Sequence, residues 1–484
     1  MTNRILNKYS WIVALGLLFS TIASSCGSLK AVKAEAPIPS PSQFSHSADS
    51  LTGIAVTKQL VFSDSILIAL IQTAVKNNPD VLIAEQRINS AKAYYKIRKG
   101  ALLPNIVAGT NAGVRKYGDY TMEGVGNYDT NLSPNINDQQ KVSTPIVQDF
   151  FLGLSSSWEI DLWGKLGNMK KAAKLQWLAS TEGRNLVVTA IVAEVAFRYY
   201  DLLALDAKLE ILQQNLALQD SIVQIAIVQQ EVGRATMLAV QQFQAQHLRT
   251  QSAVVAHQQE IIRVENELNI LLGQFPQHIA RSKDFPLSRT ASLHLMLQPQ
   301  IVLQQRPDIL KAEWELKATK ADVAAAKAAL LPALTLAPSL GYSSFNSTLL
   351  FNPASLAFGV VSGLAAPLVN RSAIRGTINQ SKAAQQEAYH SYYKTILHAY
   401  QEIETTLSNI NKLNEIYNLN AQETILLTEA VATSNELYKV GYATYLEVIT
   451  SQRIALEANF NIIETQKSLQ YNLVTLYRAI GGNW

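Results

Sequence analysis

Cysteine is almost absent from this chain of 484 residues, which contains only Cys26. One cysteine cannot form a disulfide within the chain, so packing must stabilise the fold. Charge is also scarce, because Asp, Glu, Lys and Arg make up 16% of the residues, against roughly 25% in ordinary soluble domains. The net charge is +4 and no basic run occurs, whereas proteins that bind nucleic acid gather Lys and Arg on one face. We therefore expect no nucleic-acid partner.

The residue patterns of catalytic and cofactor sites are missing as well. The seven histidines are scattered and form no cluster with the spacing of metal ligands. The sequence has no phosphate-binding glycine loop and no Gly-x-Ser-x-Gly nucleophile motif. The acidic and aromatic segment 158–165 resembles a carbohydrate-active site in composition, but its place between a strand and a helix favours a structural role. We expect no enzyme activity, no metal and no cofactor.

Long apolar runs are confined to the N-terminus. Arg4 and Lys8 precede an apolar segment, and small residues then lead to Cys26. This pattern predicts a signal peptide over residues 1–25, with Cys26 as the acylated first residue of a bacterial lipoprotein. An ordinary signal peptide with a spare cysteine is the alternative. Residues 26–60 are rich in Ser, Pro and Ala, which indicates an extended linker behind the lipid anchor.

The rest of the sequence consists of two similar repeats. Asp80 and Pro104 are 24 residues apart, as are Asp308 and Pro332, and both pairs lie in similar Pro-Asp and Leu-Leu-Pro motifs. Two further matching motifs follow in the same order and at equal distances from a later glycine: Val232–Thr236 with Gly273, and Val440–Thr444 with Gly481. Equal order and spacing indicate a tandem duplication. We predict one repeat over residues 61–275, a linker over 276–300 and a second repeat over 301–484.

Each repeat combines long helices with a pair of strands. Four stretches without Gly or Pro carry apolar residues at intervals of three and four, which predicts long amphipathic helices: 184–232, 234–272, 377–440 and 442–480. A shorter helix precedes each Leu-Leu-Pro motif. The apolar stripes are too many for one chain to cover, so copies of the same chain are the expected partners.

Alternation with a period of two predicts four strands, at about 105–117, 147–162, 333–344 and 354–367. Apolar residues alternate with small or polar ones, which is typical of a transmembrane barrel and also of a half-covered soluble sheet. No stretch after the signal peptide is long and apolar enough for a membrane helix, so strands must make any membrane crossing. Four strands cannot close a barrel and open edges are not tolerated in lipid, so other protomers must complete it. The first pair encloses the longer polar loop, as on the outer face of such barrels.

These motifs resemble those of the TolC-like outer membrane factors, in particular the lipoprotein branch of multidrug-efflux channels. The resemblance covers about residues 61–482, and its most specific pieces are the repeated Pro-Asp to Leu-Pro blocks and the segments 158–164 and 441–453. It implies a mainly α chain that forms a homotrimer, with a twelve-stranded transmembrane β-barrel continued by a periplasmic α-helical barrel. It also implies a periplasmic adaptor (membrane fusion) protein and an inner-membrane transporter, of the proton-driven drug-efflux class, as partners. The chain would lie in the outer membrane, in contact with its lipid, and extend into the periplasm.

The resemblance places the tunnel's periplasmic aperture at the turn that carries Gly441, with Gly233 at the matching turn of the first repeat. It implies that Tyr438, Leu446 and Glu447 lie at or near the constriction. Thr450 stands where the family often has an aspartate, which leaves Glu447 as the candidate for an acidic ring. Three such carboxylates would repel one another and raise their affinity for protons. A solvated helix-surface carboxylate is the alternative for Glu447.

The expected function is a passive outer-membrane exit duct for small molecules, such as drugs or similar toxic compounds, in a tripartite efflux system. Two alternatives remain from the sequence: an exit duct for type I protein secretion, and a periplasmic lipoprotein scaffold.

Overall fold

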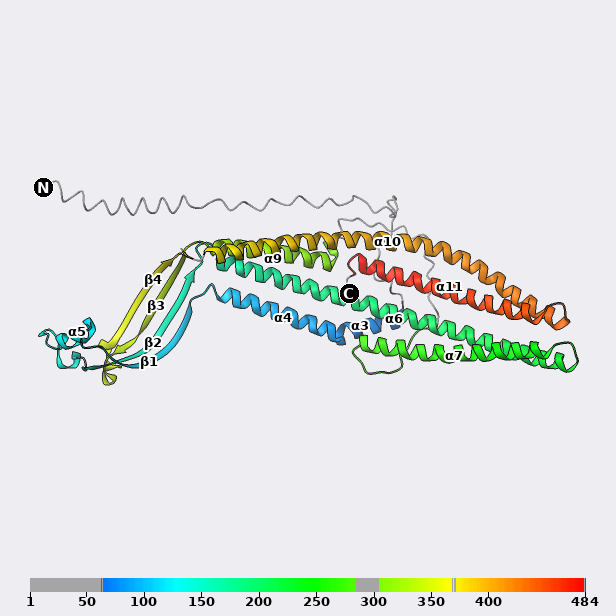
Figure 1. Ribbon diagram of the computed structural model, residues 1–484, viewed down its shortest axis with the longest axis horizontal. Helices are drawn as coiled ribbons and strands as arrows, with labels where there is room; N and C mark the ends of the chain where they lie inside the picture. The colour runs from blue at the N-terminus through cyan, green and yellow to red at the C-terminus, as the bar shows by residue number, and fades with distance from the viewer. Residues whose placement is uncertain (1–61, 63, 284–303, 368, 370, 483) are drawn as a thin grey trace, which may run out of the picture. The chain divides into compact units, whose positions relative to one another are not determined.

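The computed structural model describes residue 62 and residues 64–283, 304–367, 369, 371–482 and 484. The predicted signal peptide, Cys26 and the N-terminal linker lie outside these residues. The described part is a repeated order of helix, two strands, long helix and helix (Figure 1). The elements of the first repeat are α3 (Ser65–Asn77), α4 (Pro79–Gly100), β1 (Asn105–Lys116), α5 (Met122–Thr130), β2 (Ile146–Ile160), α6 (Lys165–Glu231) and α7 (Met237–Leu271). Those of the second are α9 (Pro307–Ala328), β3 (Ala333–Ser344), β4 (Leu356–Ala365), α10 (Arg371–Val440) and α11 (Tyr445–Ala479).

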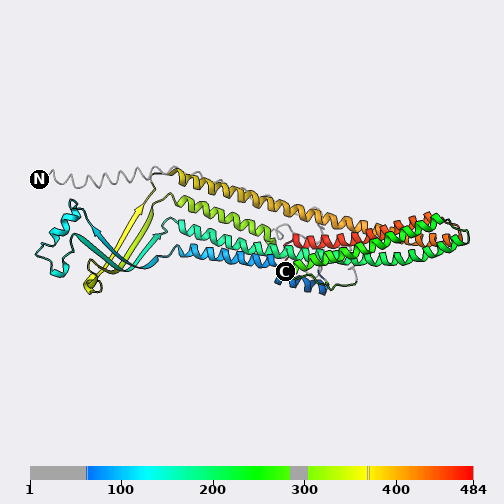
Figure 2. The same cartoon turned by 60° about the horizontal axis from the view of Figure 1, so that its bottom comes forward.

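The helices pack as two long hairpins, each joined at one tip by a tight turn. Helix α7 folds back along α6, and α11 folds back along α10, as both views show (Figures 1 and 2). The shorter helices α4 and α9 lie along the other half of α6, and α9 also packs against α10. Within the described residues, no helix has a stretch of 18 residues apolar enough to cross a membrane.

The two longest helices begin earlier than the sequence pattern predicts. We expected them from residues 184 and 377, just after a glycine, but α6 begins at Lys165 and α10 at Arg371. A glycine inside a helix costs only about 1 kcal/mol relative to alanine, which packing along a long helix offsets. The neighbour of Gly183 does not require a glycine, because a Cβ built there would meet the side chain of Lys311 of α9 at an ordinary contact distance of 3.8 Å.

The four strands form one antiparallel sheet in the order β1-β2-β3-β4. Their ends lie within two residues of the expected ranges. Cross-strand neighbours share a face, and the register pairs Leu154 with Leu340 and Leu340 with Phe358. The opposite face carries Gly153 against Gly341, and Ser155 against Ser339. One face is thus mainly apolar, and the other is mainly small and polar, with the Phe151 ring lying over Gly153 and Gly341.

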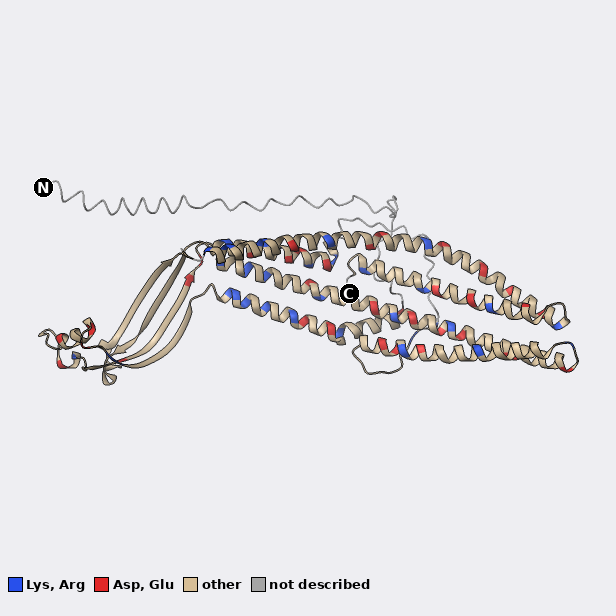
Figure 3. Ribbon diagram, viewed as in Figure 1, with Lys and Arg blue, Asp and Glu red and all other residues tan. Residues whose placement is uncertain are grey.

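Charged residues are rare on the sheet and common along the helices (Figure 3). Arg115, Asp149 and Glu159 lie on the small and polar face, whereas Lys116, paired with Ile146, lies at the end of the apolar face. On the apolar face, Phe358 is 83% exposed in the single chain. Among the described residues, strands β1 and β4 each have one unpaired edge. The sheet therefore needs both an apolar environment on one face and further strands at its edges.

The main core lies where α3, α6, α7 and α11 meet. Leu67, Val195, Tyr199, Leu268 and Val474 are fully buried in it. The start of the predicted inter-repeat linker belongs to this core, because Ile279 is buried there. The chain's last residue, Trp484, stacks edge-on against Phe62 with ring centroids 5.5 Å apart.

Each repeat is closed by the same junction between the start of its short helix and the end of its last helix. In the first repeat, the Asn78 amide donates to the carbonyl of Leu271 at 2.8 Å. In the second, the Arg306 guanidinium donates to the carbonyl of Ala479 at 2.7 Å. The motif pairs found in the sequence thus meet in space at equivalent positions.

Candidate functional site

The two hairpin tips have the same backbone. Gly233 and Gly441 both adopt a left-handed conformation, with φ of +72° and +86°, which non-glycine residues rarely adopt. Two successive N–H groups after each glycine donate to one carbonyl of the preceding helix, that of Gln229 in the first turn and that of Leu437 in the second. A threonine then caps the returning helix. The glycines predicted to mark the tip turns therefore do so for a clear conformational reason.

The threonine caps of the two tips differ in the partner three residues later. The Thr236 hydroxyl accepts a hydrogen bond from the Ala239 N–H at 3.3 Å. At the second tip, the Glu447 carboxylate also reaches back, and it accepts from the Thr444 N–H at 2.6 Å and from its hydroxyl at 2.8 Å. This reciprocal arrangement is a capping box, which the first tip lacks. Only the second tip therefore carries a fixed carboxylate.

The capping box keeps Glu447 charged. The hydrogen bond from the Thr444 backbone and then that from its hydroxyl lower the pKa of Glu447 below its ordinary value. The side chain is exposed, so it is available to ions. Within one chain the pKa shift is opposite to the rise expected for three converging carboxylates, because the local hydrogen bonds favour the ionised form.

Tyr438 lies inside the tip. It is 7% exposed, and its ring packs edge-on against Phe243 of the first repeat with centroids 5.5 Å apart. Burial raises the pKa of Tyr438, and its hydroxyl has no hydrogen-bond partner among the described residues. An aperture-lining role was expected for this side chain. In the single chain this side chain is covered by the other repeat, and its place at the aperture stays a prediction.

The remaining predicted aperture residues are more accessible. Leu446 is 62% exposed, next to Glu447, while Thr450 is half-buried one turn further along α11. At the first tip, Leu238 is the counterpart of Leu446 and is also exposed. Sequence reasoning left out its exposed apolar neighbours Val232 and Met237, although both flank the Gly233 turn. The tips thus present apolar side chains and a carboxylate from each hairpin, since Glu231 is exposed at the end of α6, but only Glu447 is held in a capping box.

The segment 158–165 joins the sheet to the helices. The Trp158 indole donates to the carbonyl of Leu102 at 3.0 Å, and the Trp163 indole donates to that of Pro332 at 2.7 Å. The Asp161 carboxylate accepts from the N–H groups of Leu166 and Gly167 at the start of α6, and Lys165 pairs with Glu159 at 2.5 Å. These contacts anchor both Leu-Leu-Pro motifs and give the segment a structural role.

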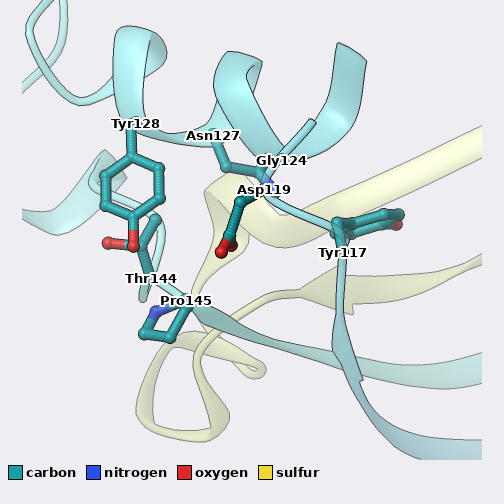
Figure 4. Close-up of a pocket in the computed structure, with 7 residues that line it drawn as sticks. All are labelled: Tyr117, Asp119, Gly124, Asn127, Tyr128, Thr144 and Pro145. Carbon is teal, nitrogen blue, oxygen red and sulfur yellow. The ribbon is translucent and has the colours of Figure 1, made fainter. Parts of the chain in front are cut away.

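A small pocket lies in the loop between β1 and β2. Figure 4 shows it lined by Tyr117, Asp119, Tyr128 and Pro145, among others. None of the predicted site residues lies there. The described residues contain no group of three His, Cys, Asp or Glu side chains placed to hold a metal ion.

Comparisons with known proteins agree with this architecture. A family model described as outer membrane efflux protein matches residues 70–274 and 298–482. The cation efflux system protein CusC of Escherichia coli strain K12 is 28% identical over 455 residues, which cover 92% of this chain and 94% of CusC. The pyoverdine export outer membrane protein OpmQ of Pseudomonas putida is 30% identical over 434 residues, or 87% of each chain.

Solved structures show the same fold. The outer-membrane channel OprN superposes with a TM-score of 0.83 at 22% identity, over 93% of this chain and 98% of OprN. A CusC structure gives 0.79 at 25% identity, over the same shares. The expected fold class is confirmed: a mainly α chain whose strands belong to a transmembrane β-barrel and whose helices continue it as an α-helical barrel. The expected location, in the outer membrane and extending into the periplasm, is confirmed as well.

The relatives are named as efflux proteins and channels rather than enzymes. Outer membrane factors of efflux systems are trimers that work with an adaptor protein and an inner-membrane transporter. The function expected from the sequence, an outer-membrane channel of a tripartite efflux system rather than a periplasmic scaffold, is therefore confirmed. The chain belongs to the outer membrane efflux protein family and is the outer-membrane channel component of a tripartite efflux system.

Proposed function

We propose that three copies of this chain form a passive exit duct for small toxic molecules, closed at rest near Gly441 and opened by the adaptor. The carrying observation is the incomplete sheet, with two open edges and an exposed apolar face. Lipid does not tolerate open edges, and four strands are too few for a barrel. Neighbouring copies supply the missing strands in the simplest symmetric way.

Small molecules fit this duct better than polypeptides as cargo. CusC is named for cation efflux and OpmQ for pyoverdine export, and both relatives match along nearly the whole chain. Type I protein secretion is the second candidate, because it uses the same architecture. The inner-membrane partner is proposed to be a proton-driven drug-efflux transporter. The duct itself catalyses no reaction, and Cys26 is proposed to carry the lipid anchor.

Closure at the periplasmic end is proposed to depend on the second hairpin. Leu446 would narrow the aperture, with Thr450 one turn above it and Tyr438 supporting the tip from within. Three Glu447 carboxylates would attract cations to the constriction. The capping box favours this role, because it holds each carboxylate charged at the start of α11.

The aperture is tested by recording single channels in planar bilayers. Leu446→Ala combined with Glu447→Ala should raise conductance and reduce the preference for cations. Glu457→Ala is the matched control, since this carboxylate is similarly exposed on α11 but lies ten residues further from the turn. Unchanged conductance and selectivity in the double variant would place the gate elsewhere on these helices.

The cargo is tested in cells that lack their own outer-membrane efflux channels. Expression of this chain with its adaptor and transporter should lower the accumulation of a fluorescent drug. Export of a type I secreted polypeptide, without any effect on drug accumulation, would favour the second candidate instead.

A further inference from the structure

The two hairpins pack against each other with a stagger near their tips. Phe243 lies ten residues beyond Gly233, yet its ring contacts Tyr438 and Tyr445, which lie only three and four residues from Gly441. These contacts belong to a buried apolar cluster that draws on all four helices, which we name the tip layer: Ile222, Val223, Ala226, Val240, Phe243, Tyr438 and Val448.

One helical turn further from the tip, every helix places a polar side chain on the same face. In an α-helix, residues four apart lie one above the other on one face. Four residues from a member of the tip layer, on the side away from the turn, stand Gln219 on α6, His247 on α7, Ser434 on α10 and Gln452 on α11. We name these four residues the polar layer.

The polar layer is buried. Gln452 is 2% exposed and Gln219 is 4% exposed, which places these amides among the least accessible side chains of the hairpins. Ser434 is also buried, and His247 is half-buried. Glutamine is mostly found on protein surfaces, so two such residues at one level of a helical bundle are unusual.

Much of the hydrogen-bonding capacity of the polar layer is unused. Both amide atoms of Gln452, the amide oxygen of Gln219 and Nδ1 of His247 are buried without a partner among the described residues. The bonds that exist stay within one helix: the Gln219 amide donates to Asn215 at 2.7 Å, and the Ser434 hydroxyl donates to the Val431 carbonyl at 3.0 Å. These side chains therefore form no hydrogen bond that ties the two hairpins together.

The polar layer destabilises the contact between the two hairpins at this one position along their length. A buried polar group without a partner retains its desolvation penalty, whereas an apolar group of the same shape would be neutral or stabilising. Separating the hairpins at this level would admit water, which can satisfy every one of these atoms. The tip layer, by contrast, loses apolar contacts on separation.

We propose that the polar layer is a release point at which hairpin α10–α11 separates from α6–α7 when the aperture opens. This inference rests on the proposed gated duct, because a channel that is always open needs no such device. The packed tip is held by the aromatic contacts of the tip layer, and the polar layer sets how easily water enters behind them.

The test combines Gln219→Leu with Gln452→Leu in the full-length trimer. Hydrogen exchange followed by mass spectrometry should become about tenfold slower in peptides covering residues 434–452, because the apolar layer suppresses local opening. Drug export should fall in parallel. Gln385→Leu is the control, since this glutamine is also buried on α10 but lies far from the tip, and both readouts should match the unmodified protein.

A second variant covers the case in which the double variant does not assemble. Gln452→Glu should instead accelerate exchange in the same peptides, because a carboxylate at this level favours the hydrated state. Exchange at 434–452 that is unchanged in these variants would overturn the release point. Failure of the unmodified chain to restore export in cells would overturn the proposed function, whatever the exchange rates.

Discussion

The closure of each repeat depends on a glycine that tolerates no side chain. Gly273 and Gly481 follow α7 and α11 with φ of +67° and +102°. A Cβ at Gly273 would lie 2.5 Å from the carbonyl oxygen of Asn77, and a Cβ at Gly481 would lie 2.7 Å from that of Gln305. Real Cβ atoms do not approach this closely, and in both cases the obstructing atom belongs to the backbone. The tip glycines Gly233 and Gly441 also have positive φ, but nothing lies within 4 Å of a Cβ there.

Alanine at these four positions separates backbone conformation from close packing. An alanine held in the left-handed conformation costs about 1–2 kcal/mol of stability. Replacing glycine also makes the unfolded chain less flexible, which stabilises the fold by about 0.4–1 kcal/mol, so a tip substitution should cost about 1 kcal/mol in total. Substitution of Gly273 or Gly481 carries the same conformational cost and adds about 1–3 kcal/mol for the forced shift of backbone. The expected loss of stability at the closures is therefore about 2–4 kcal/mol.

Urea unfolding of the purified protein, followed by circular dichroism, measures this difference. Gly481→Ala and Gly273→Ala should each lower the midpoint clearly more than Gly233→Ala and Gly441→Ala do. Equal midpoints for all four variants would contradict this prediction, because they would show that the two junctions relax freely around a methyl group.

Three further predictions concern single residues. Arg306→Met should destabilise the chain by about 3 kcal/mol, because it removes a buried guanidinium that pairs with the half-buried Asp308 and Glu402 and satisfies a helix-end carbonyl. The exposed ion pairs of Arg263 should be replaceable by methionine without a measurable change in unfolding. Cys26→Ala should abolish acylation while trimers still form; a mature, unmodified N-terminus at another residue, found by mass spectrometry, would contradict the lipid anchor. The pKa of Glu447 is lowered, so its capping interaction is fully present above the carboxyl's ordinary pKa and is lost as pH falls through the lowered value. Acid should therefore reduce the cation preference of the channel. Thr444→Val removes one of the hydrogen bonds that lower the pKa and should move this loss to higher pH.

Periodicity made most of the architecture predictable. Helices without Gly or Pro and strands with a period of two carry their signal within a few residues, so their existence and order follow from the sequence. The early starts of α6 and α10 do not, because Gly183 and Gly376 interrupt the pattern while packing along the helix offsets their weak propensity.

The candidate site was predictable in position but not in orientation. The turn motif identified Gly441 and the cap that follows it. The face that Tyr438 presents was not predictable, because Phe243, the ring that covers it, belongs to the other repeat and reaches it through the stagger of the hairpins. Contacts between repeats depend on such offsets, and no local pattern encodes them.

The two repeats keep one junction with different chemistry. Asn78 donates to a carbonyl of α7, and its amide oxygen also caps α4 by accepting from the N–H groups of Asp80 and Val81. Arg306 makes the equivalent bond to α11 but cannot accept one. The Asp308 carboxylate compensates, since it accepts from the Ile309 N–H and pairs with the guanidinium.

The two repeats therefore differ in one way at their closures and in another at their tips. At the closures, an ion network replaces a neutral cap and the geometry is retained. At the tips, the backbone turns are again alike, but Ala239 stands where the second repeat has Glu447. A closure buried within the chain must keep its shape, whereas an exposed tip can change its charge without affecting the fold. Among the described residues, the tip carboxylate held in a capping box lies on the second hairpin, so we predict that movement of α10–α11 changes both the size and the charge of the proposed aperture.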